Sequence, residues 1–193
     1  MDRLSAVIAF ATLSTLAACN SHDDAPRPSR AETGKVGSSQ GANTDAFCDF
    51  HKRDDSGPLF SVPPVGEVKV LGPRNGNWLW LNIWATWCKP CVEEMPRIAS
   101  WQKKLPHVDL EFVSVDESDA DVATFQHAHP DAPSSARLAD DKTQSDWFKQ
   151  LGLDGNPPIP IHVFVSPTGH VRCARAGGIR EQDYPAIEKL LAE

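Results

Sequence analysis

The stretch Trp87-Cys88-Lys89-Pro90-Cys91 constrains this chain more than any other feature. Its two cysteines are separated by two residues, and they follow the apolar run 78–85 and precede a segment compatible with a helix. Two thiols this close can alternate between dithiol and disulfide without a change of fold. A catalyst of thiol–disulfide exchange requires such a pair.

The alternative for such a pair is one half of a zinc site. A zinc site needs a second pair of Cys or His residues at ligand spacing, and the sequence contains no such pair. His127 and His129 stand at the end of an expected helix, where we expect both to be solvated. We therefore expect redox chemistry, with no metal and no other cofactor.

The length of 193 residues and the 40% hydrophobic content predict one compact domain with additional segments. Acidic residues outnumber basic ones by 26 to 19, which gives a formal net charge of -7. This charge argues against a nucleic-acid-binding surface.

The first residues predict export from the cytoplasm. The run from Leu4 to Ala18 is almost wholly apolar or small, and it is short enough to be a signal-peptide core rather than a membrane-spanning helix. Leu16-Ala17-Ala18-Cys19 resembles a bacterial lipobox, which implies cleavage before Cys19 and lipidation of that residue. The alternative is an ordinary cleaved signal peptide with an incidental cysteine. We expect a signal peptide at 1–18.

Residues 20–45 contain no aromatic residue and are rich in Ser, Asp, Gly, Pro and Ala. Such a segment cannot bury enough apolar surface to offset the entropy of ordering. We therefore expect a flexible tether over 19–45 and a folded domain over 46–193.

Alternation of apolar residues, continuous apolar runs and turn signals predict the elements of the domain. A short strand at 67–71 precedes a turn at 72–76. The other expected strands are 78–85, 108–115, 136–139, 161–165 and 170–175, and the expected helices begin at 88, 118, 145 and 181.

The segment Leu79-Trp80-Leu81-Asn82-Ile83-Trp84-Ala85-Thr86-Trp87-Cys88-Lys89-Pro90-Cys91-Val92-Glu93-Glu94-Met95-Pro96 resembles thioredoxin-like proteins. More narrowly, it is similar to the extracytoplasmic thiol-disulfide oxidoreductases related to TlpA and ResA, over residues 60–193. The resemblance implies an α/β thioredoxin-like fold, in which helices flank a central mixed β-sheet. It also implies an N-terminal β extension and an inserted helix–strand segment at 116–150.

The resemblance assigns roles to the cysteine motif. Cys88, at the junction of a strand and a helix N-terminus, is expected to be the nucleophile, because the helix dipole and free N–H groups stabilise a thiolate there. Lys89 adds positive charge, and Pro90 fits the first helical turn. Cys91 is expected to be the less accessible resolving cysteine, and Trp87 to shield the sulfur pair.

Pro160 matches the cis-proline that faces the cysteine pair in the family, and the backbone of Ile159 before it is expected to pair with a substrate strand. The alternative is a trans proline in a proline-rich loop, because Pro157 and Pro158 are close by.

Glu94 stands three residues beyond the second cysteine, where ResA-like members carry a glutamate. The acid that cytoplasmic thioredoxins carry in the central strand is replaced by Asn82, which cannot titrate. A partly buried Glu94 suits proton transfer. The alternative is that Glu93 and Glu94 are both solvated helix residues.

Unpaired thiols are uncommon in an oxidising compartment, so pairing is also expected for Cys48 and Cys173. The bridge resembles a second disulfide of some TlpA-like proteins and would staple the N-terminal extension to the domain. Two buried free cysteines are the alternative. His162 is the histidine expected nearest the active site.

The resemblance implies a lipid-anchored envelope reductase that faces the periplasm from the outer or inner membrane. It would take electrons from a transmembrane thiol-reductant carrier and reduce disulfide-bearing proteins in cytochrome c maturation or copper-site assembly. We expect a monomer that contacts the membrane through its anchor and binds no nucleic acid.

The direction of electron transfer stays open, because a few tens of millivolts decide it. A disulfide-donating oxidase is therefore an alternative. A Sco-like copper chaperone would need a wider cysteine spacing and a distant histidine ligand, neither of which is evident. No peroxiredoxin signature surrounds Thr86.

Overall fold

A computed structural model of the protein describes residues 42–62, 71–138 and 141–193. The predictions for the signal peptide, Cys19, the tether up to residue 41 and most of the strand at 67–71 lie outside these residues. In the described ranges, no helix is long and apolar enough to cross a membrane.

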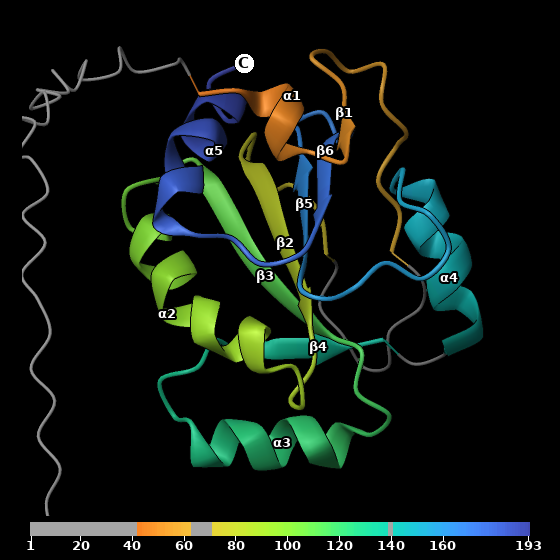
Figure 1. Ribbon diagram of the computed structural model, residues 1–193, viewed down its shortest axis with the longest axis vertical. Coiled ribbons are helices and arrows are strands. Elements are labelled where there is room, and N and C mark those ends of the chain that lie inside the picture. Colours follow the sequence, from red (N-terminus) through yellow and green to blue (C-terminus); the bar gives the residue numbers. More distant parts are fainter. Residues whose placement is uncertain (1–41, 63–70, 139–140) are drawn as a thin grey trace, which may run out of the picture. The chain divides into compact units, whose positions relative to one another are not determined.

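The described residues form a sheet with strand order β1-β6-β5-β2-β3-β4 and helices on both of its faces (Figure 1). This is the thioredoxin-like fold that the sequence predicts. The elements in chain order are α1 (Thr44–Phe47), β1 (Phe50–His51), β2 (Trp78–Trp84), α2 (Lys89–Gln102), β3 (Val108–Ser114), α3 (Asp119–Ala128), β4 (Ser135–Arg137), α4 (Asp141–Gln150), β5 (Ile161–Val165), β6 (Val171–Ala176), the 3₁₀ turn η1 (Glu181–Asp183) and α5 (Tyr184–Leu190).

β2 is the central strand, parallel to β3 and antiparallel to β5. All its residues are buried, as its continuous apolar sequence predicts for a strand that is covered on both faces. Because side chains alternate along a strand, Trp80 and Trp84 contribute to the core beneath α2 and α5, whereas Leu79 and Leu81 contribute to the core beneath α4. Trp80 and Trp84 are both fully buried in the core beneath α2 and α5.

The segment 116–150 adds α3, β4 and α4 to the central sheet. Ser118 caps α3, because its side chain accepts a hydrogen bond from the Asp121 N–H. β4 extends the sheet beyond β3 as a parallel strand.

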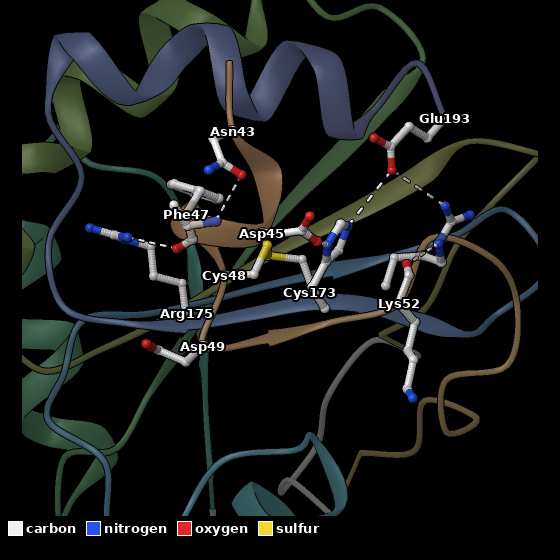
Figure 2. Close-up of a disulfide and its surroundings, with 12 residues drawn as sticks. Asn43, Asp45, Phe47, Cys48, Asp49, Lys52, Cys173, Arg175 and Glu193 are labelled. Carbon is white, nitrogen blue, oxygen red and sulfur yellow. Dashed lines mark hydrogen bonds and ion pairs between the residues drawn. A yellow bond between two sulfur atoms is a disulfide. The ribbon is translucent and has the colours of Figure 1, made fainter. Parts of the chain in front are cut away.

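The N-terminal extension folds against the opposite edge of the sheet. β1 pairs antiparallel with β6, and a disulfide joins Cys48 to Cys173, with a Cα–Cα distance of 5.6 Å (Figure 2). The disulfide therefore ties α1 to β6, in the arrangement favoured by the sequence. α1 begins at Thr44, before the predicted domain start at residue 46, because Asn43 caps this helix and Thr44 is buried.

Candidate active site

The cysteine motif lies at the junction between the central strand and α2. Cys88 is the N-cap of α2, and its Sγ accepts a hydrogen bond from the Cys91 N–H at 3.3 Å. The two cysteines form a disulfide with a Cα–Cα distance of 5.3 Å. Cys88 is 4% exposed and Cys91 is fully buried. Cys88 is thus the outer sulfur and Cys91 the inner one, on a helix N-terminus that favours a thiolate at Cys88 after reduction.

The exposed part of the motif consists of Trp87 and Lys89. Trp87 is 69% exposed. The Lys89 ammonium lies 3.6 Å from Glu93, and both side chains are largely exposed. Solvent and this carboxylate therefore screen the positive charge that Lys89 brings to Cys88.

Asp116 holds the turn that leads into Cys88. Its carboxylate accepts hydrogen bonds from the Thr86 N–H at 3.0 Å and from the Thr86 hydroxyl at 2.7 Å. The Ser114 hydroxyl donates at 2.5 Å to Oδ2, the oxygen that also accepts the 3.0 Å hydrogen bond from the Thr86 N–H, whereas the Thr86 hydroxyl donates to Oδ1. No motif in the sequence singles out Asp116. The sequence feature that could have pointed to Asp116 is its position just beyond β3, the parallel neighbour of β2, because the carboxyl ends of parallel strands meet at one sheet edge.

The Ile159–Pro160 peptide bond is cis, as the resemblance implies. Pro160 is buried immediately before β5, and its carbonyl accepts a hydrogen bond from the Gly177 N–H at 2.8 Å. A Cβ added to Gly178 would lie 3.5 Å from Oε2 of Glu94 and 4.0 Å from Cγ of Pro160. Gly178 therefore stands beside both predicted site residues.

Glu94 is buried, with 2% of its surface exposed, whereas the neighbouring Glu93 is exposed. Oε1 of Glu94 accepts a hydrogen bond from the Asn82 amide at 3.0 Å, and Oε2 accepts one from the Ile179 N–H at 2.9 Å. Cys91 and Glu94 are both buried residues of α2 at i, i+3 spacing, which places them on one helix face. Glu94 is therefore not the solvated helix residue of the alternative interpretation.

His162 is fully buried, with Nε2 only 3.2 Å from Oε1 of Glu94. The sequence places it near the site but does not reveal this contact. The signal is the register, because His162 and Asn82 are directly opposite each other on β5 and β2.

In the described part of the chain, no group of three or more His, Cys, Asp or Glu side chains could hold a metal ion.

The sequence model described as the AhpC/TSA family matches residues 54–174, which is more than half of the chain. The chain belongs to the AhpC/TSA family. The matched range includes the cysteine motif, Glu94 and Pro160, so the candidate site lies within the family's domain.

Curated proteins similar to this chain include the thioredoxin-like protein YneN of Bacillus subtilis, which is 41% identical over 73 residues, covering 35% of this chain and 43% of YneN. The thiol-disulfide oxidoreductase ResA of Bacillus thuringiensis is 30% identical over 115 residues, covering 59% of this chain and 64% of ResA. Each match spans less than two thirds of the relative. These relatives confirm the similarity to ResA-like proteins that the motifs indicate.

A solved thiol:disulfide interchange protein of Chlorobium tepidum is 21% identical, with a TM-score of 0.49 over 61% of this chain and 81% of that protein.

Proposed function

We propose that this AhpC/TSA family member is a thiol-disulfide oxidoreductase that reduces disulfides of other proteins through Cys88 and Cys91. The observation that carries the proposal is the disulfide at the N-terminus of α2, with an outer Cys88 and a fully buried Cys91. The names of the relatives, ResA above all, support the same activity.

In the proposed reaction the reduced protein begins as a Cys88 thiolate and a Cys91 thiol. The thiolate attacks one sulfur of the substrate disulfide, forms a Cys88–substrate disulfide, and releases the other substrate sulfur as a thiolate that takes a proton from solvent. Cys91 then loses its proton to Glu94 and attacks Sγ of Cys88. This step forms the Cys88–Cys91 disulfide and expels the second substrate thiolate. Two electrons have passed from the protein to the substrate.

The buried position of Glu94 on the face of α2 that carries Cys91 supports its role as proton acceptor. A carboxylate that is held by fixed donors and shielded from water can act as a general base for a thiol that solvent does not reach. The proton returns to Cys91 when an external dithiol reduces the disulfide.

Substrate docking is proposed for the segment immediately before β5, which carries Ile159 and the buried Pro160. We propose that the backbone of Ile159 pairs with an extended segment of the substrate, which would place its disulfide against Cys88.

We further propose that the protein works outside the cytoplasm as a lipoprotein anchored at Cys19. The second disulfide, Cys48–Cys173, supports an oxidising compartment. A transmembrane thiol-reductant carrier would supply the electrons. Protein substrates in cytochrome c maturation or copper-site assembly would receive them, with the protein acting as a monomer. Cys19→Ala should release the protein from the membrane fraction or leave it unprocessed, and unchanged anchoring would contradict this part of the proposal.

Insulin reduction tests the activity. The pre-reduced protein should reduce the insulin disulfides stoichiometrically and, with excess dithiothreitol, catalytically, whereas Cys88→Ser should be inactive. Cys48→Ser/Cys173→Ser is the matched control, because it removes two cysteines outside the motif and should retain activity. Failure of the wild-type protein to reduce insulin would contradict the proposed reductase activity. Faster disulfide donation to a reduced, unfolded protein would favour the oxidase instead, and copper binding without insulin reduction would favour a chaperone.

A further inference from the structure

A buried polar cluster extends from Glu94 into the centre of the sheet. Its members are side chains of α2, β2 and β5, all of them buried: Glu94, Trp80, Asn82 and His162. Because Asn82 and His162 are cross-strand partners, the amide and the imidazole lie on the sheet face that α2 covers.

Nδ1 of His162 faces two nitrogens that can only donate. Trp80 donates its indole N–H to Nδ1 at 3.3 Å, and Nδ2 of Asn82 lies 3.4 Å from the same atom. The orientation of the amide is fixed because Nδ2 also donates to the Glu94 carboxylate. Nδ1 is therefore the accepting nitrogen, and the proton of the neutral imidazole lies on Nε2.

Nε2 of His162 lies 3.2 Å from Oε1 of Glu94. The N–H does not point straight at this oxygen in the oxidised structure, and in the described part of the chain Nε2 has no alternative hydrogen-bond acceptor. Catalytic hydrogen bonds are often poorly aligned in a resting state and tighten during the reaction. Oε1 of Glu94 is thus an acceptor within hydrogen-bond distance of Nε2, although the hydrogen bond is not formed in the oxidised structure.

The two oxygens of Glu94 are occupied unequally. Oε1 faces the Asn82 amide and the His162 ring, whereas Oε2 accepts a single hydrogen bond, from the Ile179 N–H. Each carboxylate oxygen has about two acceptor sites, so Oε2 keeps one for a further proton. Oε2 is also the oxygen beside Gly178, where the absence of a side chain leaves room.

We propose that His162 is a positioning residue that orients the Glu94 carboxylate for proton transfer with Cys91. The imidazole N–H holds Oε1, and Oε2 accepts the proton as the Cys91 sulfur attacks Cys88 and the substrate thiolate leaves with its bonding pair. This inference deepens the proposed function, because it assigns an atom and an orienting partner to the proton transfer of that reaction.

Other ionisable groups face the cluster from α2 and β6. From α2 these are Cys91 and Arg97, and the Arg97 guanidinium donates to the Ile179 carbonyl and to Glu181. From β6 it is Arg175, the cross-strand neighbour of His162, whose guanidinium donates to the Phe47 carbonyl. Both guanidinium groups donate to other acceptors, so the hydrogen bonds to the Glu94 carboxylate come from the Asn82 amide and the Ile179 N–H, and Nε2 of His162 lies 3.2 Å from Oε1.

The first test measures the tautomer of His162 directly. In a ¹⁵N-labelled wild-type protein, long-range ¹H–¹⁵N spectra at neutral pH should show His162 with an unprotonated Nδ1 and a protonated Nε2. A proton on Nδ1, alone or together with one on Nε2, would overturn the proposal. This measurement needs no variant and no substrate.

The second test follows the resolving step alone. The reduced protein should react with 5,5′-dithiobis(2-nitrobenzoate) in two phases: Cys88 first forms a mixed disulfide and releases one thionitrobenzoate, and Cys91 then displaces the second. The rate of the second phase should rise with pH along a limb that is lost in Glu94→Gln. In His162→Leu this limb should move to higher pH by about one unit, the size expected for the loss of one hydrogen bond to a charged group.

His162→Gln serves as the conservative variant. Because a Gln side chain can donate a hydrogen bond to Glu94, the pH limb of this variant should lie close to that of the wild type. His127→Leu, on the exposed surface of α3, is the matched control and should leave the limb in place. In a Glu94→Gln background, His162→Leu should change the profile no further. An unshifted limb in His162→Leu, or an equal shift in His162→Gln, would overturn the proposal.

These tests are separate from the insulin assay. A protein that fails to reduce insulin but shows the expected tautomer and shifted limb would contradict the proposed function and support the positioning role. If His162→Leu does not fold, the tautomer of His162 and the pH profile of His162→Gln decide the question. A limb in His162→Gln that lies well away from its wild-type pH would then contradict the positioning role of His162.

Discussion

Asp116 binds both the N–H and the hydroxyl of Thr86, and so fixes the turn that carries Cys88 onto the N-terminus of α2. The carboxylate is itself held by the Ser114 hydroxyl and is buried. Because these contacts satisfy the Thr86 N–H immediately before the motif, the position of Cys88 depends on a residue just beyond the neighbouring strand β3.

Asp116→Asn should therefore lower stability and slow the reaction of Cys88. The amide turns one acceptor into a donor that opposes the donors already facing it, and an unsatisfied buried group costs about 1–3 kcal/mol. Urea unfolding should report a loss of about that size, and the first phase of the dithiobis(nitrobenzoate) reaction should be slower. Glu117→Gln, an exposed neighbour, is the control. Equal stabilities of the two variants would contradict the role of Asp116.

Glu94→Gln and Glu93→Gln form a matched pair on successive residues of α2. Since only Glu94 is buried behind the cysteines, Glu94→Gln should slow the resolving step at neutral pH by about a hundredfold, within the range for loss of a general base. Glu93→Gln should leave the rate within about twofold. A pH profile of Glu94→Gln that matches the wild type would show that this carboxylate does not handle the proton.

Removal of the Cys48–Cys173 disulfide should destabilise the fold without abolishing exchange. The bridge spans a sequence separation of 125 residues, and loss of a native disulfide typically costs about 2–5 kcal/mol. Unfolding of Cys48→Ala/Cys173→Ala in urea, compared with wild type, measures the difference. A variant as stable as wild type would mean that α1 and β1 dock on β6 without help from the bridge.

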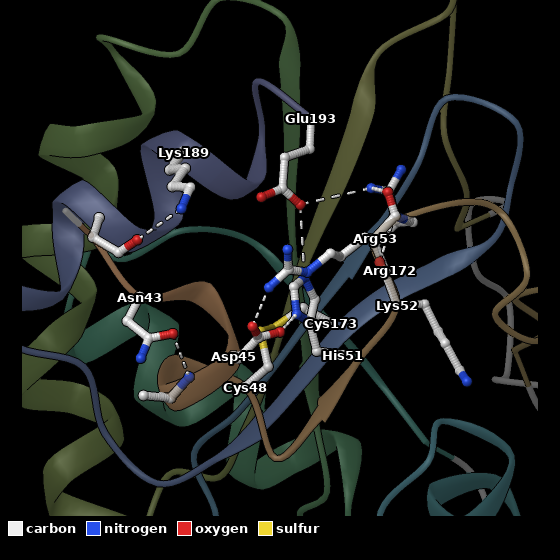
Figure 3. Close-up of polar contacts among 12 residues, drawn as sticks. Asn43, Asp45, Cys48, His51, Lys52, Arg53, Arg172, Cys173, Lys189 and Glu193 are labelled. Carbon is white, nitrogen blue, oxygen red and sulfur yellow. Dashed lines mark hydrogen bonds and ion pairs between the residues drawn. A yellow bond between two sulfur atoms is a disulfide. The ribbon is translucent and has the colours of Figure 1, made fainter.

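The Asp45 carboxylate should make the free energy of unfolding depend on pH in the acid range. Its carboxylate lies between His51 and Arg53 (Figure 3), and hydrogen bonds from the His51 ring and then from Arg53 hold the pKa of Asp45 below its ordinary value. A lowered folded-state pKa contributes stability above about pH 4, and this contribution disappears as the pH falls through the folded-state value.

The stability difference between wild type and Asp45→Asn should therefore be constant near neutral pH and shrink below about pH 4. Urea midpoints from pH 2 to 7 measure it, with Asp154→Asn, an exposed aspartate before β5, as the control. A difference that grows on acidification would contradict the direction of the pKa shift.

The sequence predicts most features that depend on local pattern. The strand before Cys88, the helix after it and the cap at Ser118 follow from apolar runs and residue spacing, and the structure has all three. The cis form of the Ile159–Pro160 bond came from the family resemblance, because no local property of the sequence requires it.

Contacts between strands could not be predicted in the same way. The approach of His162 to Glu94 depends on the register of β5 against β2, and Asp116 reaches Thr86 only because β3 runs parallel to β2. Residues so far apart in the chain show no periodic signal that links them. α1 was also missed, since a single turn contains too few residues for a helical stripe.

The most direct test of the account is a trapping experiment with Cys91→Ser, which leaves Cys88 without its resolving partner. When the reduced variant is incubated with insulin whose disulfides are intact, or with an envelope extract, it should accumulate mixed disulfides that dithiothreitol releases. Mass spectrometry should place each of them on Cys88. Cys88→Ser should form none under the same conditions. Mixed disulfides that form equally in Cys88→Ser, or that map to Cys91 in the wild type, would contradict the assignment of Cys88 as nucleophile and Cys91 as resolving cysteine.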